Sequence, residues 1–294
     1  MMLKHHQKAL ESLNSATLYI VATPIGNLSD ITLRALAVLQ KADWICAEDT
    51  RVTAQLLGAY GIRAKLLSVR EHNERQMAGK VIEALRAGQT VAQVSDAGTP
   101  AVCDPGAKLV QSVREAGFKV VPVAGASALM AVLSVAGISE PNVYFHGFLP
   151  AKSGERQKLL ASWRECPYAV MAFESPHRIA AALDDIAAVL PQRQIMLARE
   201  VSKTFETFLH GSAEQVRDAV QSDADQRRGE MVLVLYPAPP QPADDTLPEE
   251  AQRVMRILSA QLPTKQAADL AAQISGAGKK ALYDWAVAQK NQAG

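Results

Sequence analysis

The chain has 294 residues, 48% hydrophobic and 21% charged, and these proportions are typical of a globular protein with a sizeable core. They exclude intrinsic disorder over most of its length. The 31 lysines and arginines nearly balance the 30 aspartates and glutamates. The resulting net charge of +1 excludes a basic surface that covers a whole domain, so a nucleic-acid partner must bind through local patches.

Three features of the sequence bear on the cellular compartment. No apolar run approaches the roughly 20 residues that a membrane-spanning helix requires. The polar residues 1–15 lack the apolar stretch of a secretory signal. Cys46, Cys103 and Cys166 are widely spaced and odd in number, which indicates a reducing compartment. We therefore expect a cytoplasmic protein with no membrane association and no metal site.

In the first half of the chain, short apolar runs alternate with longer segments of helical spacing. The expected strands are residues 18–22, 44–47, 65–69, 90–94 and 119–123. The expected helices are residues 31–40, 52–57, 75–86, 106–116 and 128–135. This alternation is typical of an α/β domain with a largely parallel sheet.

The pattern changes after the turn-rich residues 147–154. The expected strands are residues 168–173, 194–198, 204–210 and 230–236. The expected helices are residues 155–164, 176–190 and 212–221. The interval between the second and third of these strands is too short for a helical crossover, so those two strands should be antiparallel neighbours. We expect a second α/β domain with a mixed sheet.

Four prolines in residues 237–242 predict an extended linker. Three helical patterns follow, at residues 248–260, 263–274 and 279–290. The expected organisation is a polar N-terminal extension (1–16), an N-terminal α/β domain (17–147), a C-terminal α/β domain (148–236), a proline-rich linker (237–247) and a small helical module (248–294).

The most informative segment is residues 95–106, SDAGTPAVCDPG, which directly follows an expected strand. Its length exceeds the two to six residues of an ordinary βα turn. Its small residues allow the backbone to approach a ligand closely. The segment lacks both the G-x-G-x-x-G spacing and the GK[ST] of a P-loop. It therefore favours a ligand without a pyrophosphate.

Three other segments follow strands at the same expected edge of the sheet: TPIGNLSD (23–30), EDTR (48–51) and AGASA (124–128). The carboxyl ends of parallel strands converge, and ligands bind there. Two of the polar residues also have a purely structural explanation, because Ser127 and Asp49 are suitable helix N-caps.

These segments resemble the class III S-adenosylmethionine-dependent methyltransferases, the tetrapyrrole-methylase superfamily, and within it the ribosomal RNA small subunit methyltransferase I group. The resemblance spans residues 17–235 and also rests on REHNE (70–74), FESPHR (173–178), ARE (198–200), residues 203–206 and GEM (229–231). One departure is the loop TPIGNL, because tetrapyrrole methylases usually carry a glycine-rich run there.

The resemblance implies two α/β domains with a cofactor cleft between them, homodimerisation, and 2′-O-methylation of a cytidine in the decoding region of 16S rRNA, in the small ribosomal subunit. It implies that S-adenosylmethionine is held by main-chain contacts. The cofactor-binding positions would be Pro24, Asp96, Gly98, Ala101, Val102, Ser127, Ala128, Phe173, Glu230 and Met231. An adenine ring suits apolar walls such as Val102 and Phe173.

Methyl transfer from a sulfonium needs no metal, but the protein must align the reactants and assist loss of the hydroxyl proton. The candidate catalytic residues are Glu174, His177, Glu200 and Lys203. Each also has a structural explanation: the first two as helix caps, Glu200 as a partner of Arg199, and Lys203 as a solvated lysine.

The candidate substrate-binding residues are Asp49, Arg51, Arg178 and Arg199, because a guanidinium suits phosphate geometry. Local basic clusters at residues 152–164, 227–228 and 279–280 are further candidates for RNA contact. Two other functions stay open: a small-molecule tetrapyrrole C-methyltransferase, and a non-catalytic ribosome-assembly factor that binds RNA. The TPIGNLSD loop and the proline-linked module count against the former.

Overall fold

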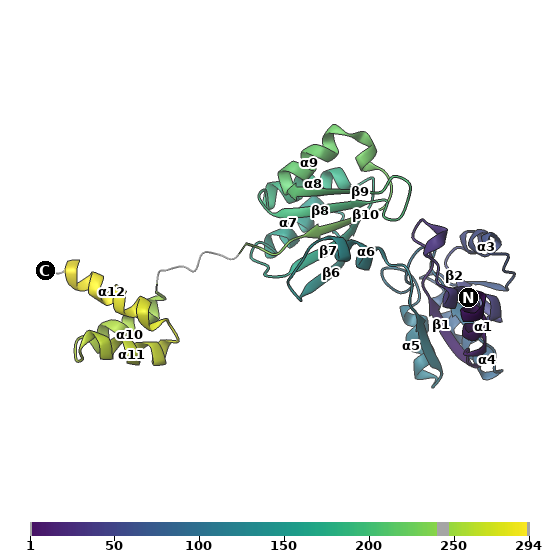
Figure 1. Ribbon diagram of the computed structural model, residues 1–294, viewed down its shortest axis with the longest axis horizontal. Coiled ribbons are helices and arrows are strands. Elements are labelled where there is room, and N and C mark those ends of the chain that lie inside the picture. Colours follow the sequence, from purple (N-terminus) through teal and green to yellow (C-terminus); the bar gives the residue numbers. More distant parts are fainter. Residues whose placement is uncertain (1, 240–246, 293–294) are drawn as a thin grey trace. The chain divides into compact units, whose positions relative to one another are not determined.

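A computed structural model describes residues 2–239 and 247–292. The chain forms two compact units, Met1–Pro237 and Ala238–Gly294, which are coloured by sequence in Figure 1. Most of the expected linker, residues 240–246, lies outside the described residues. No helix in the described part of the chain is long and apolar enough to cross a bilayer.

The first sheet of the larger unit has five strands in the order β3-β2-β4-β1-β5. Their bounds are β1 Thr17–Val21, β2 Trp44–Ala47, β3 Leu66–Ser68, β4 Val91–Gln93 and β5 Lys119–Val123. Every neighbouring pair is parallel, with Leu18 of β1 opposite Val91 on one side and Val120 on the other. The expectation of a parallel sheet is confirmed, and all carboxyl ends lie at one edge.

Helices cover both faces of this sheet because side chains alternate along each strand. Tyr19 and Val21 of β1 pack with α2 (Leu33–Lys41) and α3 (Thr50–Ala59). Leu18 packs on the opposite face with α4 (Glu74–Arg86) and α5 (Ala107–Glu115). An unexpected helix, α1 (Met2–Glu11), precedes β1, and the short 3₁₀ helix η1 (Leu28–Asp30) follows it.

The second sheet has the order β6-β7-β10-β8-β9. Its strands are β6 Val143–Phe148, β7 Ala169–Glu174, β8 Gln194–Arg199, β9 Thr207–Ser212 and β10 Met231–Leu235. The predicted antiparallel pairing of β8 with β9 is confirmed. Strand β6, parallel to β7, was not predicted, and a bulge between Phe145 and Gly147 breaks its alternation. The expected domain boundary after residue 147 falls inside β6.

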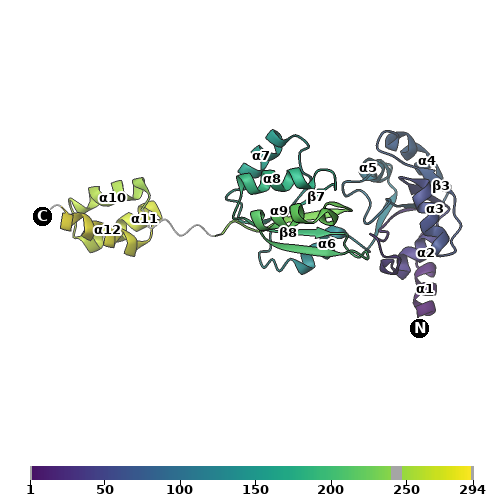
Figure 2. The ribbon, with the colours of Figure 1, turned by 90° about the horizontal axis from the view of Figure 1, so that it is seen from above.

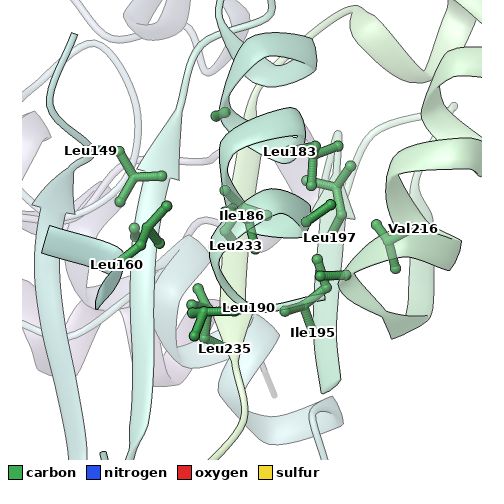
Figure 3. Packing of buried hydrophobic residues seen from close by; sticks show 14 of the residues in the cluster. Leu149, Leu160, Leu183, Ile186, Leu190, Ile195, Leu197, Val216, Leu233 and Leu235 are labelled. Carbon is green, nitrogen blue, oxygen red and sulfur yellow. The ribbon is translucent and has the colours of Figure 1, made fainter. Parts of the chain in front are cut away.

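Three helices, α7 (Ser153–Ser162), α8 (Ile179–Val189) and α9 (Ala213–Ser222), cover one face of the second sheet, and α6 (Ala128–Val135) covers the other (Figure 2). Figure 3 shows side chains of α8, among them Leu183, packed against the strand residues Leu197 and Leu233. Burial of each such leucine contributes about 1.5–3 kcal/mol. This core fixes the strand ends that carry the second half of the site. The 3₁₀ helix η2 (Ala224–Arg227) lies between α9 and β10.

The smaller unit consists of α10 (Glu249–Ser259), α11 (Thr264–Ser275) and α12 (Lys279–Gln292), as the sequence predicts. The helices share an apolar core that includes Met255, Ala268 and Leu282. Gly276, with φ +72°, follows α11 as a left-handed C-cap and separates it from α12.

Candidate active site

The loops that follow β1 and β4 are joined by main-chain hydrogen bonds. The amide of Thr23 donates to the carbonyl of Gly98 (2.9 Å), and the amide of Gly98 donates to the carbonyl of Thr23 (3.1 Å). The hydroxyl of Thr99 then donates to the carbonyl of Ala126 (3.1 Å), in the loop after β5. Three loops from adjacent strands therefore form one continuous edge.

Two glycines make this close approach possible. A Cβ atom at Gly125 would lie 2.9 Å from the Cβ of Ala22, closer than two carbon atoms normally approach. Gly98 has φ +77°, a conformation that other residues rarely adopt, and its Cβ would lie 3.3 Å from Ile25. The small residues of these loops are thus a packing requirement.

Backbone strain is concentrated in two loops. Among the described residues, five non-glycine residues have a positive φ, and four of them lie in loops 95–106 and 200–206. These four are Ala101 (+66°), Cys103 (+65°), Glu200 (+53°) and Ser202 (+69°). Such conformations cost about 1–3 kcal/mol each and persist only where the surroundings enforce them, which is common at functional sites.

A buried carboxylate supports the strained loop 95–106. Oε1 of Glu74 accepts hydrogen bonds from the amides of Gly106 and Leu109, both at 2.9 Å. Glu74 is only 3% exposed, and no side chain of Gly106 is available to cap α5. Glu74, at the start of α4, therefore caps a helix that begins 33 residues later. Reasoning from the residues did not single it out, although it closes the REHNE segment.

A cavity of about 600 Å³ lies at the carboxyl ends of β2, β3 and β4. Its charged lining comprises Glu48 and Asp49 after β2, Arg70, Glu71, His72 and Glu74 after β3, and Asp96, Asp104 and Lys108 after β4. The amide of Asp49 donates to Oδ1 of Asp96 (3.1 Å). The structure thus brings together one residue expected to bind substrate and one expected to bind cofactor.

Burial and neighbouring carboxylates disfavour the ionisation of two groups in this cavity, Glu48 and Asp104. Burial, and then the charges of Asp96, Asp104 and Asp49, raise the pKa of Glu48 despite the opposing charge of Arg70. Burial and the charges of Asp96 and Glu230 raise the pKa of Asp104, although the Ser95 hydroxyl opposes this. Glu48, Arg70, His72 and Asp104 were not singled out from the sequence; the only signal was polar residues directly after buried strands.

Asp49 and Arg51 form a bidentate pair at the start of α3. Nε of Arg51 donates to Oδ1 of Asp49 (3.0 Å), and Nη2 donates to Oδ2 (2.5 Å). The amide of Arg51 also donates to Oδ1 (2.8 Å), so Asp49 is the N-cap that the sequence offered as its alternative role. These hydrogen bonds hold the pKa of Asp49 well below its usual range.

The loop after β8 carries a three-residue charge cluster. Nζ of Lys203 donates to Oε1 of Glu200 (2.8 Å) and to Oε2 of Glu230 (3.0 Å). The amide of Glu230 also donates to Oε1 of Glu200 (2.9 Å). Burial lowers the pKa of Lys203, but the two carboxylates outweigh this effect and the pKa is raised. Burial raises the pKa of Glu200, but its hydrogen bonds reverse the shift and the pKa is lowered. Lys203 and Glu200 are therefore ionised at neutral pH.

This cluster contacts the loop that follows β1. The aliphatic chain of Lys203 occupies the position that a Cβ atom at Gly26 would take. The hydroxyl of Ser202 donates a hydrogen bond to the carboxylate of Asp30. The structure therefore brings the expected catalytic residues Glu200 and Lys203, and the expected cofactor residue Glu230, onto the loop 23–30.

Other expected site residues are engaged elsewhere. The side chain of Glu174 is fully buried, accepting from the amide of Ser175 (2.7 Å) and from Nη2 of Arg178 (3.1 Å). Burial raises the pKa of Glu174 in spite of these contacts. Arg178 also donates to the carbonyl of Leu149. His177, by contrast, is exposed.

Arg199 and Met231 face the protein interior. Nε of Arg199 donates to the hydroxyl of Thr207 (2.9 Å), and Nη2 donates to the carbonyl of Phe205 (2.9 Å), so this guanidinium holds the loop 200–206 together. Met231 is 3% exposed and packs in the core under α8. Phe173 of β7 packs against Phe145 of β6, with the ring centroids 5.1 Å apart.

The remaining expected cofactor residues lie on the loops already described. Pro24 is buried beside Thr23, and Val102 exposes an apolar side chain (38%). Ser127 caps α6 by accepting from the amide of Met130 (3.5 Å), next to Ala128. The expected basic cluster 152–164 loses one member, because Arg156 is buried in an ion pair with Asp185.

Comparisons with known proteins establish the family. Residues 17–217 match the tetrapyrrole (corrin/porphyrin) methylases, which is more than half of the chain. The chain belongs to the tetrapyrrole methylase family. Residues 245–290 of this tetrapyrrole methylase match a second family, described as the RsmI C-terminal HTH domain.

Relatives place this tetrapyrrole methylase within one group. It is 65% identical over 289 residues to the ribosomal RNA small subunit methyltransferase I of Neisseria meningitidis serogroup B, covering 98% of this chain and 99% of that protein. It is 46% identical to the protein of the same name from Escherichia coli O157:H7, covering 98% and 100%.

Solved structures share the fold. A cobalt precorrin-4 methyltransferase matches with a TM-score of 0.55 at 19% identity, over 74% of this chain and 94% of that one. A uroporphyrin-III C-methyltransferase from Thermus thermophilus, complexed with S-adenosyl homocysteine, matches with a TM-score of 0.52 at 17% identity, over 75% and 97%. These likenesses confirm the predicted fold class.

The family identifies this tetrapyrrole methylase as an S-adenosylmethionine-dependent methyltransferase, and its residues fit that cofactor. Val102 exposes an apolar surface, and Asp96 exposes a carboxylate on the same loop. Such a combination suits an adenosine, whose ring is apolar and whose amino and hydroxyl groups need polar partners.

The contact between Gly26 and Lys203 predicts the effect of one methyl group. We expect Gly26→Ala to displace the Lys203 side chain and to lower kcat for methyl transfer by about 10- to 100-fold, because a shift of roughly 1 Å in a positioned group costs that much. Steady-state kinetics at saturating S-adenosylmethionine measure this change. Gly154→Ala is the matched control, since nothing lies within 4 Å of its added methyl. An unchanged kcat in Gly26→Ala would contradict the positioning role.

Proposed function

We propose that this enzyme methylates the ribose 2′-oxygen of a cytidine in the decoding region of 16S rRNA, within the small ribosomal subunit. The relative at 65% identity is a ribosomal RNA small subunit methyltransferase, which supports small-subunit rRNA as the substrate. The observation that carries the chemistry is the ionised Lys203 cluster, which lies against the loop after β1.

The cofactor would be held by the loops of the first sheet and by two strand ends of the second. S-adenosylmethionine supplies a methyl group already activated on a sulfonium. We propose contacts from Asp96, Gly98, Ala101 and Val102 on the loop after β4. Further proposed contacts come from Pro24, Ser127, Ala128, Phe173, Glu230 and Met231. Because the Met231 side chain is in the core, only its main chain is available for such a contact.

Lys203 is the proposed catalytic residue for activating the hydroxyl. An ammonium has three N–H donors, and Glu200 and Glu230 each take one, so a third can stabilise the charge that develops on the 2′-oxygen. The hydroxyl proton passes to Lys203 as Lys203 transfers a proton to Glu200. Lys203 therefore remains an ammonium, and Glu200 ends protonated.

The other candidates fit supporting roles. Glu174 would hold the turn that precedes α8 by pairing with Arg178, since its carboxylate is buried. Arg51 is largely exposed, and with Arg178 it is the proposed contact for RNA phosphates, whereas Arg199 supports the loop 200–206. The exposed His177 is a weaker candidate for proton transfer.

The unit Ala238–Gly294 is proposed to contact RNA phosphates through Lys279 and Lys280, at the start of α12. Its match to the RsmI C-terminal HTH domain supports this role. We propose the division 1–16, 17–147, 148–236, 237–247 and 248–294, except that the boundary between the two α/β domains moves back to precede α6, because α6 and β6 pack with the second sheet. The proposed location is the cytoplasm, where the substrate is found.

Homodimerisation is proposed from exposed apolar side chains on one face of the second sheet. Met130 and Val135 of α6 are more than half exposed. Phe148 contacts Phe173 on the same face. Phe208 of β9 lies opposite Ala198 of β8, whose side chain packs in the cluster under α6 on this face. Exposed apolar patches of this kind are common at interfaces between subunits.

A charge on this face should prevent dimer formation. We expect the wild-type chain to sediment as a dimer, and Met130→Lys to shift it to a monomer because the lysine would have to be desolvated. Analytical ultracentrifugation measures both states, with Ile257→Lys in the smaller unit as the exposed control. A monomeric wild type would refute the proposed dimer.

The substrate is tested with small subunits from cells that lack this protein. We expect the enzyme to transfer labelled methyl groups to their 16S rRNA, and ribose-methylation mapping to place the label on one cytidine. Labelling of a uroporphyrinogen-type substrate instead would favour the C-methyltransferase alternative. Absence of S-adenosylmethionine binding in calorimetry would favour a non-catalytic assembly factor.

Removal of the Lys203 ammonium tests the proposed catalytic residue. We expect Lys203→Met to lower kcat by about 10²- to 10⁴-fold, the usual contribution of a positioned proton-transfer group, with little change in the Kd for S-adenosylmethionine. Single-turnover kinetics and calorimetry measure the two effects. Lys80→Met, at an exposed lysine of α4, should leave both unchanged.

A further inference from the structure

The cavity at the ends of β2, β3 and β4 has the wrong charge for an RNA backbone. Six carboxylates line it, against one arginine, one lysine and one histidine. Phosphates would be repelled there, and the described residues contain no group of three or more His, Cys, Asp or Glu side chains placed to hold a metal ion. A ligand with neutral hydrogen-bond donors suits this cavity better.

Three of these six carboxylates already have partners. Asp49 is paired with Arg51, Asp96 accepts from the amide of Asp49, and Glu74 caps α5. Within the described residues, the carboxylates of Glu48 and Glu71 accept no hydrogen bond, and Oε2 of the buried Glu74 accepts none either. Glu71 is exposed, whereas Glu48 is half-buried, so Glu48 is the acceptor best placed to take a donor from a ligand in this cavity.

A hydrogen-bond donor lies next to that acceptor. Nε of Arg70 donates weakly to the main-chain carbonyl of Glu48 (3.4 Å), and its charge acts on the Glu48 carboxyl. Arg70 has four other N–H donors. Cytosine presents the complementary pattern, an amino donor at N4 beside acceptors at N3 and O2. Uracil instead has a carbonyl acceptor at position 4 and an N–H donor at N3. Its O4 would therefore face the carboxylate of Glu48, and two acceptors repel each other.

The cavity also adjoins the proposed catalytic cluster. Asp104 lies in the strained loop that lines the cavity, and it feels the charge of Glu230, which is bonded to Lys203. A nucleotide whose base enters the cavity would extend its ribose past Asp104 toward the cluster.

We propose that this cavity is the recognition pocket for the target cytosine, with Glu48 accepting from the N4 amino group and Arg70 donating to N3 or O2. This inference rests on the proposed function, because it names the group by which that same site selects cytidine.

The test compares subunits that carry cytidine or uridine at the mapped target position. We expect wild-type kcat/KM to favour cytidine strongly, and Glu48→Gln to reduce the cytidine-to-uridine ratio by roughly 10- to 100-fold, the range expected for loss of one specific base contact. The Kd for S-adenosylmethionine should stay unchanged. Glu83→Gln, an exposed glutamate on α4 outside this cavity, is the matched control and should keep the wild-type ratio.

Arg70→Met provides a second variant, in case Glu48→Gln does not fold, and should also lower the ratio. Folded variants that keep the wild-type ratio would overturn the pocket. Weaker binding of S-adenosylmethionine with an unchanged ratio would overturn it too, since the cavity would then hold the cofactor. Failure of the wild type to methylate either subunit would instead refute the proposed function on which the pocket rests.

Discussion

The reciprocal main-chain pair between Thr23 and Gly98 is the contact on which the site depends. Gly98 can make this pair because, without a side chain, it readily adopts a φ of +77°. Thr99 extends the connection to Ala126. Once these loops are joined, the exposed surfaces of Asp96 and Val102 face a common edge, and neither loop can move without the other.

Charge is distributed unequally between the two halves of the site. The first sheet supplies mainly carboxylates, while the second supplies Lys203, held by two carboxylates of its own. The strained conformation of Glu200 places its carboxylate where it accepts from both Lys203 and the amide of Glu230. The guanidinium of Arg199 ties the loop to β9, and this contact offsets the free-energy cost of the strained conformation.

Much of the architecture could be predicted because apolar runs indicate strands and turn residues indicate where the strands end. The convergence of the loops followed from a parallel sheet alone. Strand β6 was missed because its bulge removes the alternating pattern. Glu74 and Arg199 could not be assigned from sequence, since their partners lie far along the chain or on the main chain. Alternation along β10 did contain one signal: Glu230 and Met231 are consecutive, so their side chains point to opposite faces, and only one can reach a ligand.

The near-contact between Gly125 and Ala22 has an evolutionary consequence. These positions lie in loops that follow different strands, yet a methyl added at Gly125 already crowds Ala22. Descendants of this protein can enlarge either site only by moving the loops apart, which would break the bonds that join them. Both positions should therefore keep small residues in related genomes. Ligand contacts alone would not restrict the two positions together.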